Sequence, residues 1–416
     1  MTLIKFCLSR NFNKTFSIKN LRSFSSSSEG KEQERAKKTS LFDFHVARGG
    51  KIVNFAGYLL PVQYADQGIA QSHVHTRTAG CASIFDVSHM LQTYITGKDA
   101  IECFENITTA DIQGLPKGSG SLTVFTNEKA GILDDLIVNR VNSKFLYIVS
   151  NAARKEHDSQ LILDTVDRFR GKGKAVDVKF FDPMERALLA FQGSAAAKVL
   201  QELTNVNLSE LFFMNTIEAE VAGVKDCRIT RCGYTGEDGF EISIPADKGR
   251  FITEVLLDSK AGNVKLAGLG ARDSLRLEAG LCLYGNDIDE STTPIEAGLA
   301  WLVAKRRRTE KDFPGAQTVL NQLQNGCTKR RVGIVLKSGP PARHGVEIFV
   351  NGNKVGTVTS GCPSPVLNFN ISMGYVQEEY KKPGTKVDLK IRDKLYNAEI
   401  SKMPFVPSNY YQKPKS

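Results

Sequence analysis

The sequence lacks long apolar runs, paired cysteines and clustered histidines, and each absence excludes a class of protein. No unbroken apolar run reaches the roughly 18 residues that a transmembrane helix needs. The eight cysteines stand singly, with no C-x-x-C pair, which argues against a thiolate zinc site and a disulfide scaffold. Of only six histidines, His73 and His75 are two apart and would point to different sides of a helix. We therefore expect no membrane insertion and no metal.

Common nucleotide-binding and hydrolase motifs are also missing. The sequence has no P-loop, no G-x-S-x-G and no H-E-x-x-H. Gly268 and Gly270 match two glycines of a dinucleotide fingerprint, but Asp273 stands at the third position and no full strand precedes them. With 41% hydrophobic and 24% charged residues in 416, the chain is long enough for about two to three ordinary globular domains.

The net charge of +10 comes partly from the N-terminus. Residues 1–28 carry five basic side chains and no acid, are rich in serine, and interleave basic with apolar residues. This composition is typical of a mitochondrial transit peptide and predicts the mitochondrial matrix as destination, with 29–38 as a charged linker. Removing the leader leaves 50 basic against 45 acidic side chains, a net charge of +5.

Two basic clusters remain, Lys305–Arg308 and Lys329–Arg331. Neither has the interleaved aromatic residues of a nucleic-acid site, so we expect no nucleic-acid binding. A solvated surface is the simplest interpretation, and contact with an anionic small ligand or an acidic protein is the alternative.

From residue 39 to 320 the pattern predicts an α+β fold, because strands and helices mix without regular alternation. Thr39 or Ser40 is expected to cap a helix over 41–47. The longest predicted helix covers 153–169. Strands are predicted at 51–55, 90–96, 122–125, 132–141, 145–149, 176–180, 187–191, 227–231 and 240–244.

The region 325–411 has a different pattern, with six short strands separated by glycine, proline and asparagine. Asn351-Gly352-Asn353 is a strong hairpin signal. The even spacing predicts a separate all-β barrel or sandwich.

Isolated charges in apolar segments are the candidate functional residues. Asp134 and Asp135 lie in an otherwise apolar strand, and alternation sends them to opposite faces. One is then free to face a cavity, although a hydrogen-bonded edge or turn position is the alternative. Glu241 points away from the core face of its strand, toward either solvent or a pocket.

The helix predicted over 267–279 carries Arg272 and Arg276 on one face, with Asp273 placed to pair with Arg276. By pattern alone this is a salt-bridged surface helix. Tyr284 and Trp301 are by pattern alone core aromatics.

An ordered set of segments resembles the aminomethyltransferase (T-protein) family of the mitochondrial glycine cleavage system, from about Leu41 to Tyr411. The set comprises Phe85-Asp-Val-Ser-His-Met90, Gly131-Ile-Leu-Asp-Asp-Leu136, Arg231-Cys-Gly-Tyr-Thr-Gly-Glu-Asp-Gly239, Ala271-Arg-Asp-Ser-Leu-Arg-Leu-Glu-Ala-Gly280, Leu283-Tyr-Gly-Asn-Asp287, Thr359-Ser-Gly-Cys-Pro-Ser-Pro365 and Met403-Pro-Phe-Val-Pro407.

The resemblance implies a cloverleaf of three subdomains, two α+β and one C-terminal β-barrel. It also implies an enzyme that moves the one-carbon unit of an aminomethyl group from the lipoyl-lysine of H-protein to tetrahydrofolate. The products would be 5,10-methylenetetrahydrofolate, ammonia and dihydrolipoyl H-protein. The family further implies a monomer that associates loosely with the other glycine cleavage proteins.

The same resemblance implies roles for individual residues. Asp135 would be catalytic, stabilising the iminium-like carbon, and Glu241, Arg272 and Tyr410 would bind folate. Tyr284 and Trp301 would wall its pterin or benzoyl ring. H-protein or the folate tail is the expected partner of Lys305–Arg308. The alternative function is a non-catalytic folate-binding scaffold of the same fold.

Overall fold

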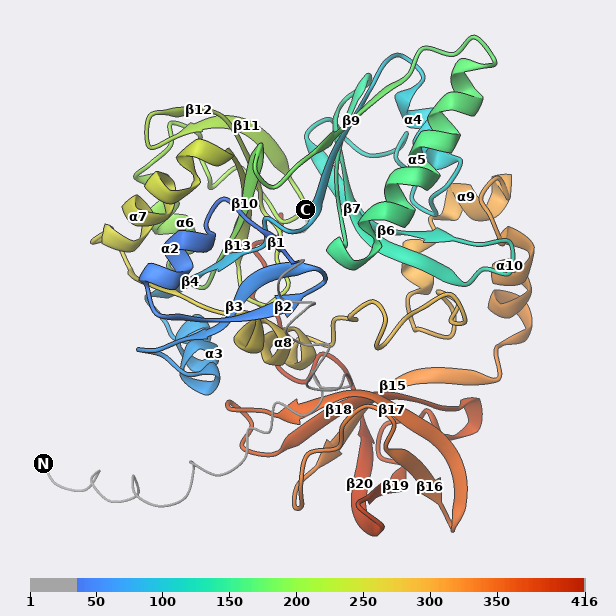
Figure 1. Cartoon of the computed structure of the whole chain (residues 1–416). Coiled ribbons are helices and arrows are strands. Elements are labelled where there is room, and N and C mark those ends of the chain that lie inside the picture. Colours follow the sequence, from blue (N-terminus) through green and yellow to red (C-terminus); the bar gives the residue numbers. More distant parts are fainter. Residues whose placement is uncertain (1–35, 415–416) are drawn as a thin grey trace, which may run out of the picture.

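The computed structural model describes residues 36–414, which form two larger sheets, a closed barrel and one small sheet. They lie as three lobes in Figure 1: a first lobe around a six-stranded sheet, a second lobe around a five-stranded sheet, and a C-terminal barrel. The proposed leader, 1–28, lies outside the described residues.

The first lobe has strand order β11-β12-β13-β10-β4-β14. Its strands are β4 (Cys81–Asp86), β10 (Arg186–Gln192), β11 (Thr216–Val221), β12 (Val224–Thr230), β13 (Gly239–Pro245) and β14 (Asn263–Leu266). Around it lie helices α2 (Phe42–Ala47), α3 (Ile69–Arg77), α6 (Ala196–Gln201) and α7 (Gly249–Asp258), with a small sheet of β1 (Lys37–Lys38), β2 (Gly50–Phe55) and β3 (Tyr58–Tyr64).

The second lobe has strand order β6-β7-β8-β5-β9. It consists of β5 (Leu91–Thr96), β6 (Ser119–Thr126), β7 (Ile132–Asn142), β8 (Phe145–Ser150), β9 (Asp177–Phe181), α4 (Ala100–Glu105) and α5 (Lys155–Arg170). The predicted periodicity of the long helix is confirmed, because α5 buries Ile162, Val166 and Phe169 at helical spacing. Helices α9 (Lys305–Glu310) and α10 (Ala316–Asn325) lie beside this lobe (Figure 1).

The C-terminal lobe is a closed barrel in the order β15-β18-β17-β16-β19-β20. Its strands are β15 (Lys329–Leu336), β16 (Glu347–Val350), β17 (Asn353–Pro363), β18 (Asn370–Gln377), β19 (Lys386–Ile391) and β20 (Lys394–Ser401). Along β15, alternate residues Val332, Ile334 and Leu336 fill the interior. Asn351 and Gly352 both have positive φ, at 51° and 80°, as a tight hairpin turn requires.

These lobes confirm the predicted α+β class and the six-stranded barrel. The expected helix cap is wrong: Leu41 holds the N-cap position of α2, without a side-chain cap hydrogen bond. Thr39 instead donates its hydroxyl to Asp86 Oδ2 at 2.8 Å, because that buried carboxylate needs donors. No helix among the described residues is long and apolar enough to cross a membrane.

Helix α8 (Leu269–Glu278) lies at the centre, between the first lobe and the barrel (Figure 1). The predicted pairing of Arg276 with Asp273 is present, at 2.8 Å. The surface location is wrong, because Arg276 is 2% exposed and also bonds Asp287 at 2.6 Å and Ser360 of the barrel at 2.9 Å.

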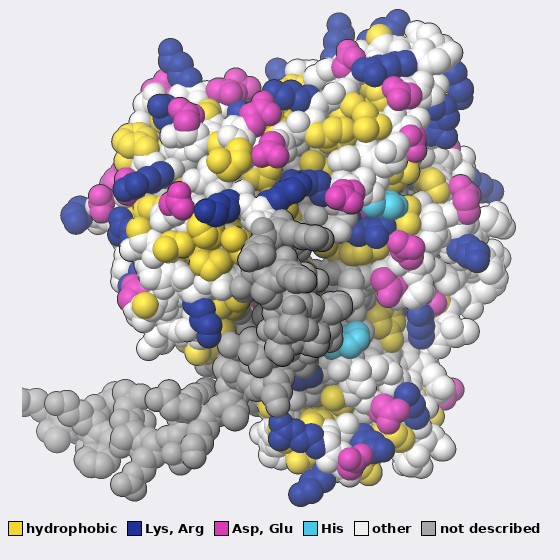
Figure 2. Space-filling model, viewed as in Figure 1, with side chains coloured by type: hydrophobic (Ala, Val, Ile, Leu, Met, Phe, Trp, Pro, Cys, Tyr) yellow, Lys and Arg dark blue, Asp and Glu magenta, His cyan; other side chains and the backbone are white. Residues whose placement is uncertain are grey.

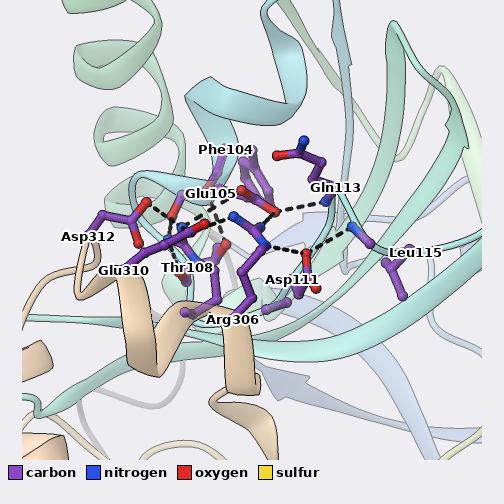
Figure 3. Close-up of polar contacts among 12 residues, drawn as sticks. Phe104, Glu105, Thr108, Asp111, Gln113, Leu115, Arg306, Glu310 and Asp312 are labelled. Atoms are coloured by element: carbon purple, nitrogen blue, oxygen red, sulfur yellow. Dashed lines mark hydrogen bonds and ion pairs between the residues drawn. The ribbon is translucent and has the colours of Figure 1, made fainter.

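In the basic cluster Lys305–Arg308, the three arginines form a clamp that is paired within the protein, and Lys305 is exposed, so the solvated-surface interpretation is corrected for Arg306 to Arg308 only. Figure 3 shows Arg306 between Glu105 and Asp111, with 2.8 Å from its Nε to Asp111 Oδ1. Arg307 is fully buried and bonds Asp312 at 2.6 Å and the carbonyls of Glu105 and Thr108, at the end of α4 and just after it. Arg308 donates to the Val303 carbonyl. On the face drawn in Figure 2, basic and acidic side chains are interspersed. A surface that binds nucleic acid is instead predominantly basic.

Replacing Arg307 by methionine should destabilise the chain by about 3–5 kcal/mol, because buried carbonyls and a carboxylate lose their partner. Urea unfolding followed by circular dichroism measures the effect. Lys305→Met, at an exposed site of the same helix, should change stability by no more than about 0.5 kcal/mol. Equal effects of the two substitutions would contradict the clamp.

Candidate active site

A cavity of about 1450 Å³ lies where the three lobes meet. Its walls come from β7 of the second lobe, β13 of the first lobe, α8, the barrel strand β15 and the chain after β20. Segments far apart in the sequence therefore line one cavity, as is usual for a small-molecule site.

Asp135 lines this cavity from β7, while its neighbour Asp134 is fully buried on the other side of the strand. The Nδ2 group of Asn151 donates to Asp135 Oδ1 at 2.9 Å. Burial, followed by the charge of Asp134, raises the pKa of Asp135 to about 7, against the lowering effect of Asn151. Asp135 is thus poised to change charge near neutral pH.

Glu241 lines the cavity from β13, and strand alternation explains its orientation. Its neighbours Phe240 and Ile242 are both fully buried in the core of the first lobe. Burial raises the pKa of Glu241, and the positive charge of Arg272 opposes this shift. The pocket alternative is therefore the one that the structure adopts, rather than a solvent-facing carboxylate.

Arg272 enters the cavity from the first turns of α8. Its guanidinium lies 4.8 Å from the centroid of the Tyr234 ring. Its Nη1 atom is buried and has no hydrogen-bond partner. An unpaired buried donor is costly, so this atom is a candidate contact for a ligand acceptor.

Two aromatic side chains, Trp301 and Tyr410, also line the cavity. Tyr410 lines it and stacks on Phe213, with ring centroids 4.2 Å apart and planes 15° apart. Trp301 also lines it, yet the side chain is 64% exposed, so the core-aromatic interpretation of Trp301 is wrong.

Tyr284 lies outside the cavity lining, so its expected position as a ring wall is corrected. Its ring packs against a hydrophobic cluster of the second lobe and lies 5.2 Å from the Arg154 guanidinium. Its hydroxyl donates to the Ile132 carbonyl at 3.2 Å, which fixes it beside β7.

Sequence reasoning missed several charged or polar cavity residues, among them His89 and Arg331. His89 is 3% exposed, its Nδ1 has no partner, and burial lowers its pKa to about 3, so the ring is neutral. Arg331 belongs to a cluster that the sequence could not separate from solvated surface, and it bonds the Ala297 carbonyl at 2.7 Å. Only the register of β15 turns it inward.

The described residues contain no group of three or more His, Cys, Asp or Glu side chains able to hold a metal ion. The seven cysteines between 36 and 414 are all free. Cys232 and Cys282 line the cavity, where burial raises the pKa of both thiols, so neither is a ready nucleophile.

Comparison with known proteins identifies the family. Residues 41–307 match the model of the GCVT N-terminal domain, and residues 329–407 match the glycine cleavage T-protein C-terminal barrel domain. The chain belongs to the aminomethyltransferase (T-protein) family of the glycine cleavage system. The human protein named aminomethyltransferase, mitochondrial, is 51% identical over 379 residues, 91% of this chain and 92% of that protein.

Other T-proteins agree over the same span. A relative from Flaveria pringlei with the same name is 48% identical, covering 90% of this chain and 91% of its own. The solved aminomethyltransferase T of the Bartonella henselae glycine cleavage system is 38% identical, with a TM-score of 0.83 over 90% of this chain and 99% of its own. The chain is therefore an aminomethyltransferase acting in glycine cleavage, and the human and Flaveria relatives are named mitochondrial.

Asp135→Asn should increase stability more at pH 8 than at pH 5. The folded pKa of Asp135 is about 7 against 3.8 when unconstrained, so the folded state binds the extra proton and loses stability as pH rises through 7. The asparagine removes this loss, on the order of 2 kcal/mol after screening. Thermal unfolding at both pH values measures it, and an equal change at both would contradict the raised pKa.

Proposed function

We propose that this chain transfers the one-carbon unit of an aminomethyl group from the lipoyl-lysine of H-protein to tetrahydrofolate. The carbon–sulfur and carbon–nitrogen bonds of the donor are replaced by bonds to two folate nitrogens. The products are 5,10-methylenetetrahydrofolate, ammonia and the dihydrolipoyl carrier. The observation that carries the proposal is the convergence of Asp135, Glu241 and Arg272 on one cavity from three different elements.

Asp135 is the catalytic group in this proposal. Release of one leaving group makes the transferred carbon iminium-like, and a preorganised carboxylate beside it stabilises the positive charge as it develops. A pKa near neutrality also suits Asp135 to exchange a proton with a folate nitrogen or the departing amine. Its isolation among Leu133, Leu136 and Ile137 supports this role, because apolar neighbours strengthen the charge interaction.

Glu241 and Arg272 are the folate-orienting pair. The pterin ring presents adjacent N–H donors, which match a carboxylate, and a carbonyl, which matches the unpaired Nη1 of Arg272. Tyr410 on Phe213, with Trp301 at an exposed edge, supplies flat surfaces for the pterin or benzoyl ring. No step of this chemistry needs a metal.

The anionic glutamate end of folate fits the barrel side of the cavity. The barrel contributes Arg331, Arg343, Lys381 and Lys382 to the lining, and its lining residues include no acid. This wall replaces Lys305–Arg308 as the expected contact of the folate tail, because the barrel residues line the cavity and residues 305–308 do not.

The proposed compartment is the mitochondrial matrix, and the proposed partners are lipoylated H-protein and, loosely, the other glycine cleavage proteins. The mitochondrial names of the relatives and the acid-free basic composition of residues 1–28 support this. A non-catalytic folate-binding scaffold remains the rival function, and Asp135 separates the two.

With aminomethylated H-protein and tetrahydrofolate, the wild-type chain should release methylenetetrahydrofolate and ammonia in equal amounts. Asp135→Ala should lower turnover by about 10³-fold or more, because charge stabilisation at the reacting carbon is lost. Trp301 fluorescence titrated with tetrahydrofolate should show that the variant still binds folate. Full activity in Asp135→Ala would rule out the mechanism, and no activity in the wild type would favour the scaffold.

Glu241→Gln should weaken tetrahydrofolate binding by about 10–100-fold, because charge-assisted hydrogen bonds each contribute roughly 1.5–3 kcal/mol. The turnover number at saturating folate should change far less, since Glu241 orients rather than reacts. Isothermal titration and steady-state kinetics separate the two effects. Glu254→Gln, half-buried on α7 and outside the cavity lining, is the control and should leave both constants unchanged.

A further inference from the structure

The chain after β20 runs along the cavity as a strap, which comprises residues 402–414. All of these residues are described, and none of them belongs to a helix or a strand. Met403, Pro404 and Tyr410 nevertheless line the cavity, so the strap forms part of its wall. A wall segment without secondary structure of its own needs tertiary contacts to hold its side chains in place.

Two backbone hydrogen bonds fasten the strap on either side of Tyr410. Before it, the N–H group of Asn409 donates to the Gly236 carbonyl at 2.7 Å. After it, the Tyr411 carbonyl accepts a hydrogen bond from the Phe213 N–H group, also at 2.7 Å. Both partners belong to the first lobe, so that lobe holds the backbone of Tyr410 from two directions.

Two pairs of stacked rings add to these bonds. Tyr410 stacks on Phe213 with ring centroids 4.2 Å apart, and Tyr411 stacks on Phe212 with centroids 5.5 Å apart and planes 10° apart. The Tyr411 hydroxyl also donates to the Ser209 carbonyl at 3.1 Å. Adjacent residues of the strap therefore pack on adjacent residues of the first lobe, and these two ring pairs together form a double stack.

A fixed guanidinium supports the outer half of the double stack. Arg231 is 3% exposed, and its guanidinium carbon lies 4.0 Å from the centroid of the Tyr411 ring. Its Nε and Nη2 atoms donate to the two oxygens of Asp238 at 2.9 and 2.5 Å. Its Nη1 atom donates to two backbone carbonyls of the first lobe at 2.7 and 2.8 Å. These hydrogen bonds fix the cation, so that it can attract the face of the Tyr411 ring.

Tyr411 differs from Tyr410 in its relation to the cavity. Tyr410 lines the cavity, whereas Tyr411 does not line it and is 39% exposed. Tyr411 therefore acts on a ligand in the cavity through its neighbour rather than by contact.

We propose that Tyr411, held by Phe212 and Arg231, is a positioning residue that fixes Tyr410 in the cavity wall for tetrahydrofolate. Holding the Tyr410 ring in place before the ligand arrives removes the entropy cost of ordering it during binding, so the double stack raises affinity. This inference rests on the proposed function for the identity of the ligand, and on the contacts of the strap for the positioning.

Ligand binding tests the positioning role. Tyr411→Leu removes both ring contacts and leaves the hydrogen bonds of Arg231 in place. Its tetrahydrofolate affinity, measured by isothermal titration, should fall about tenfold. The turnover number at saturating folate should change far less, because Tyr410 orients the ligand and does not react.

Two further substitutions serve as controls. Tyr411→Phe keeps the stack and the cation–π contact, so it should restore the wild-type affinity. Lys413→Met, at an exposed site of the same strap and outside the cavity lining, should change neither affinity nor turnover.

A double-mutant cycle separates positioning from a general structural effect. In a Tyr410→Ala background there is no ring to position, so Tyr411→Leu should leave the remaining tetrahydrofolate affinity unchanged. A full tenfold loss in that background would overturn the inference, and so would unchanged affinity in Tyr411→Leu alone. Circular dichroism melts verify that each variant is folded.

Hydrogen exchange tests the double stack without any ligand. The amides of Asn409 and Phe213 carry the two backbone bonds of the strap, so both should exchange at least about tenfold faster in Tyr411→Leu. The amides of β19, which does not line the cavity, should be unaffected.

The two measurements distinguish failure of the inference from failure of the proposed function. Unchanged exchange of the Asn409 and Phe213 amides would overturn the inference even if the enzyme is active. Faster exchange in a protein whose wild type binds no tetrahydrofolate would support the double stack and reject the proposed function.

Discussion

The buried ionic network on α8 is the constraint on which the rest of the structure depends. Arg276 bonds Asp287 at 2.6 Å, in a segment packed on the second lobe, and Ser360 of the barrel at 2.9 Å. Glu278, two residues on, accepts from His73 at 2.8 Å, Arg77 at 2.7 Å and Ser364 of the barrel. Removing one partner would leave a desolvated charge unpaired, so the three lobes are held in one relative arrangement.

That arrangement explains why the cavity exists and why its groups are perturbed. Each lobe buries its own apolar core, and the cavity remains where the three surfaces meet around α8. Arg272 lies one turn before Arg276, so the same helix that joins the lobes also presents a guanidinium to the cavity. Burial then shifts the pKa of Asp135 and Glu241 upward, which gives the site its acid–base character.

Local physical rules accounted for much of the fold and for part of the site. The Asn351-Gly352 turn, the alternation in β15 and the apolar face of α5 were all readable, because each depends on neighbours in the sequence. Alternation also separated Asp135 from Asp134 and Glu241 from its core neighbours. Whether Asp135 and Glu241 face a cavity or solvent could not be predicted from the sequence, because it depends on which lobe covers that face of each strand.

The sequence by itself determined the lobes, the barrel and, through its ordered motifs, the T-protein family. Only the tertiary structure decided where the side chains with long-range partners lie. Arg307 is buried and paired, Tyr284 packs beside β7 outside the cavity, and Arg331 lines the cavity. The physical reason is that a buried charge must find partners wherever the chain brings them, here up to about 200 residues away for Arg307 and the carbonyls of Glu105 and Thr108. Spacing along a chain records local periodicity, whereas those partners are set by how separate lobes pack.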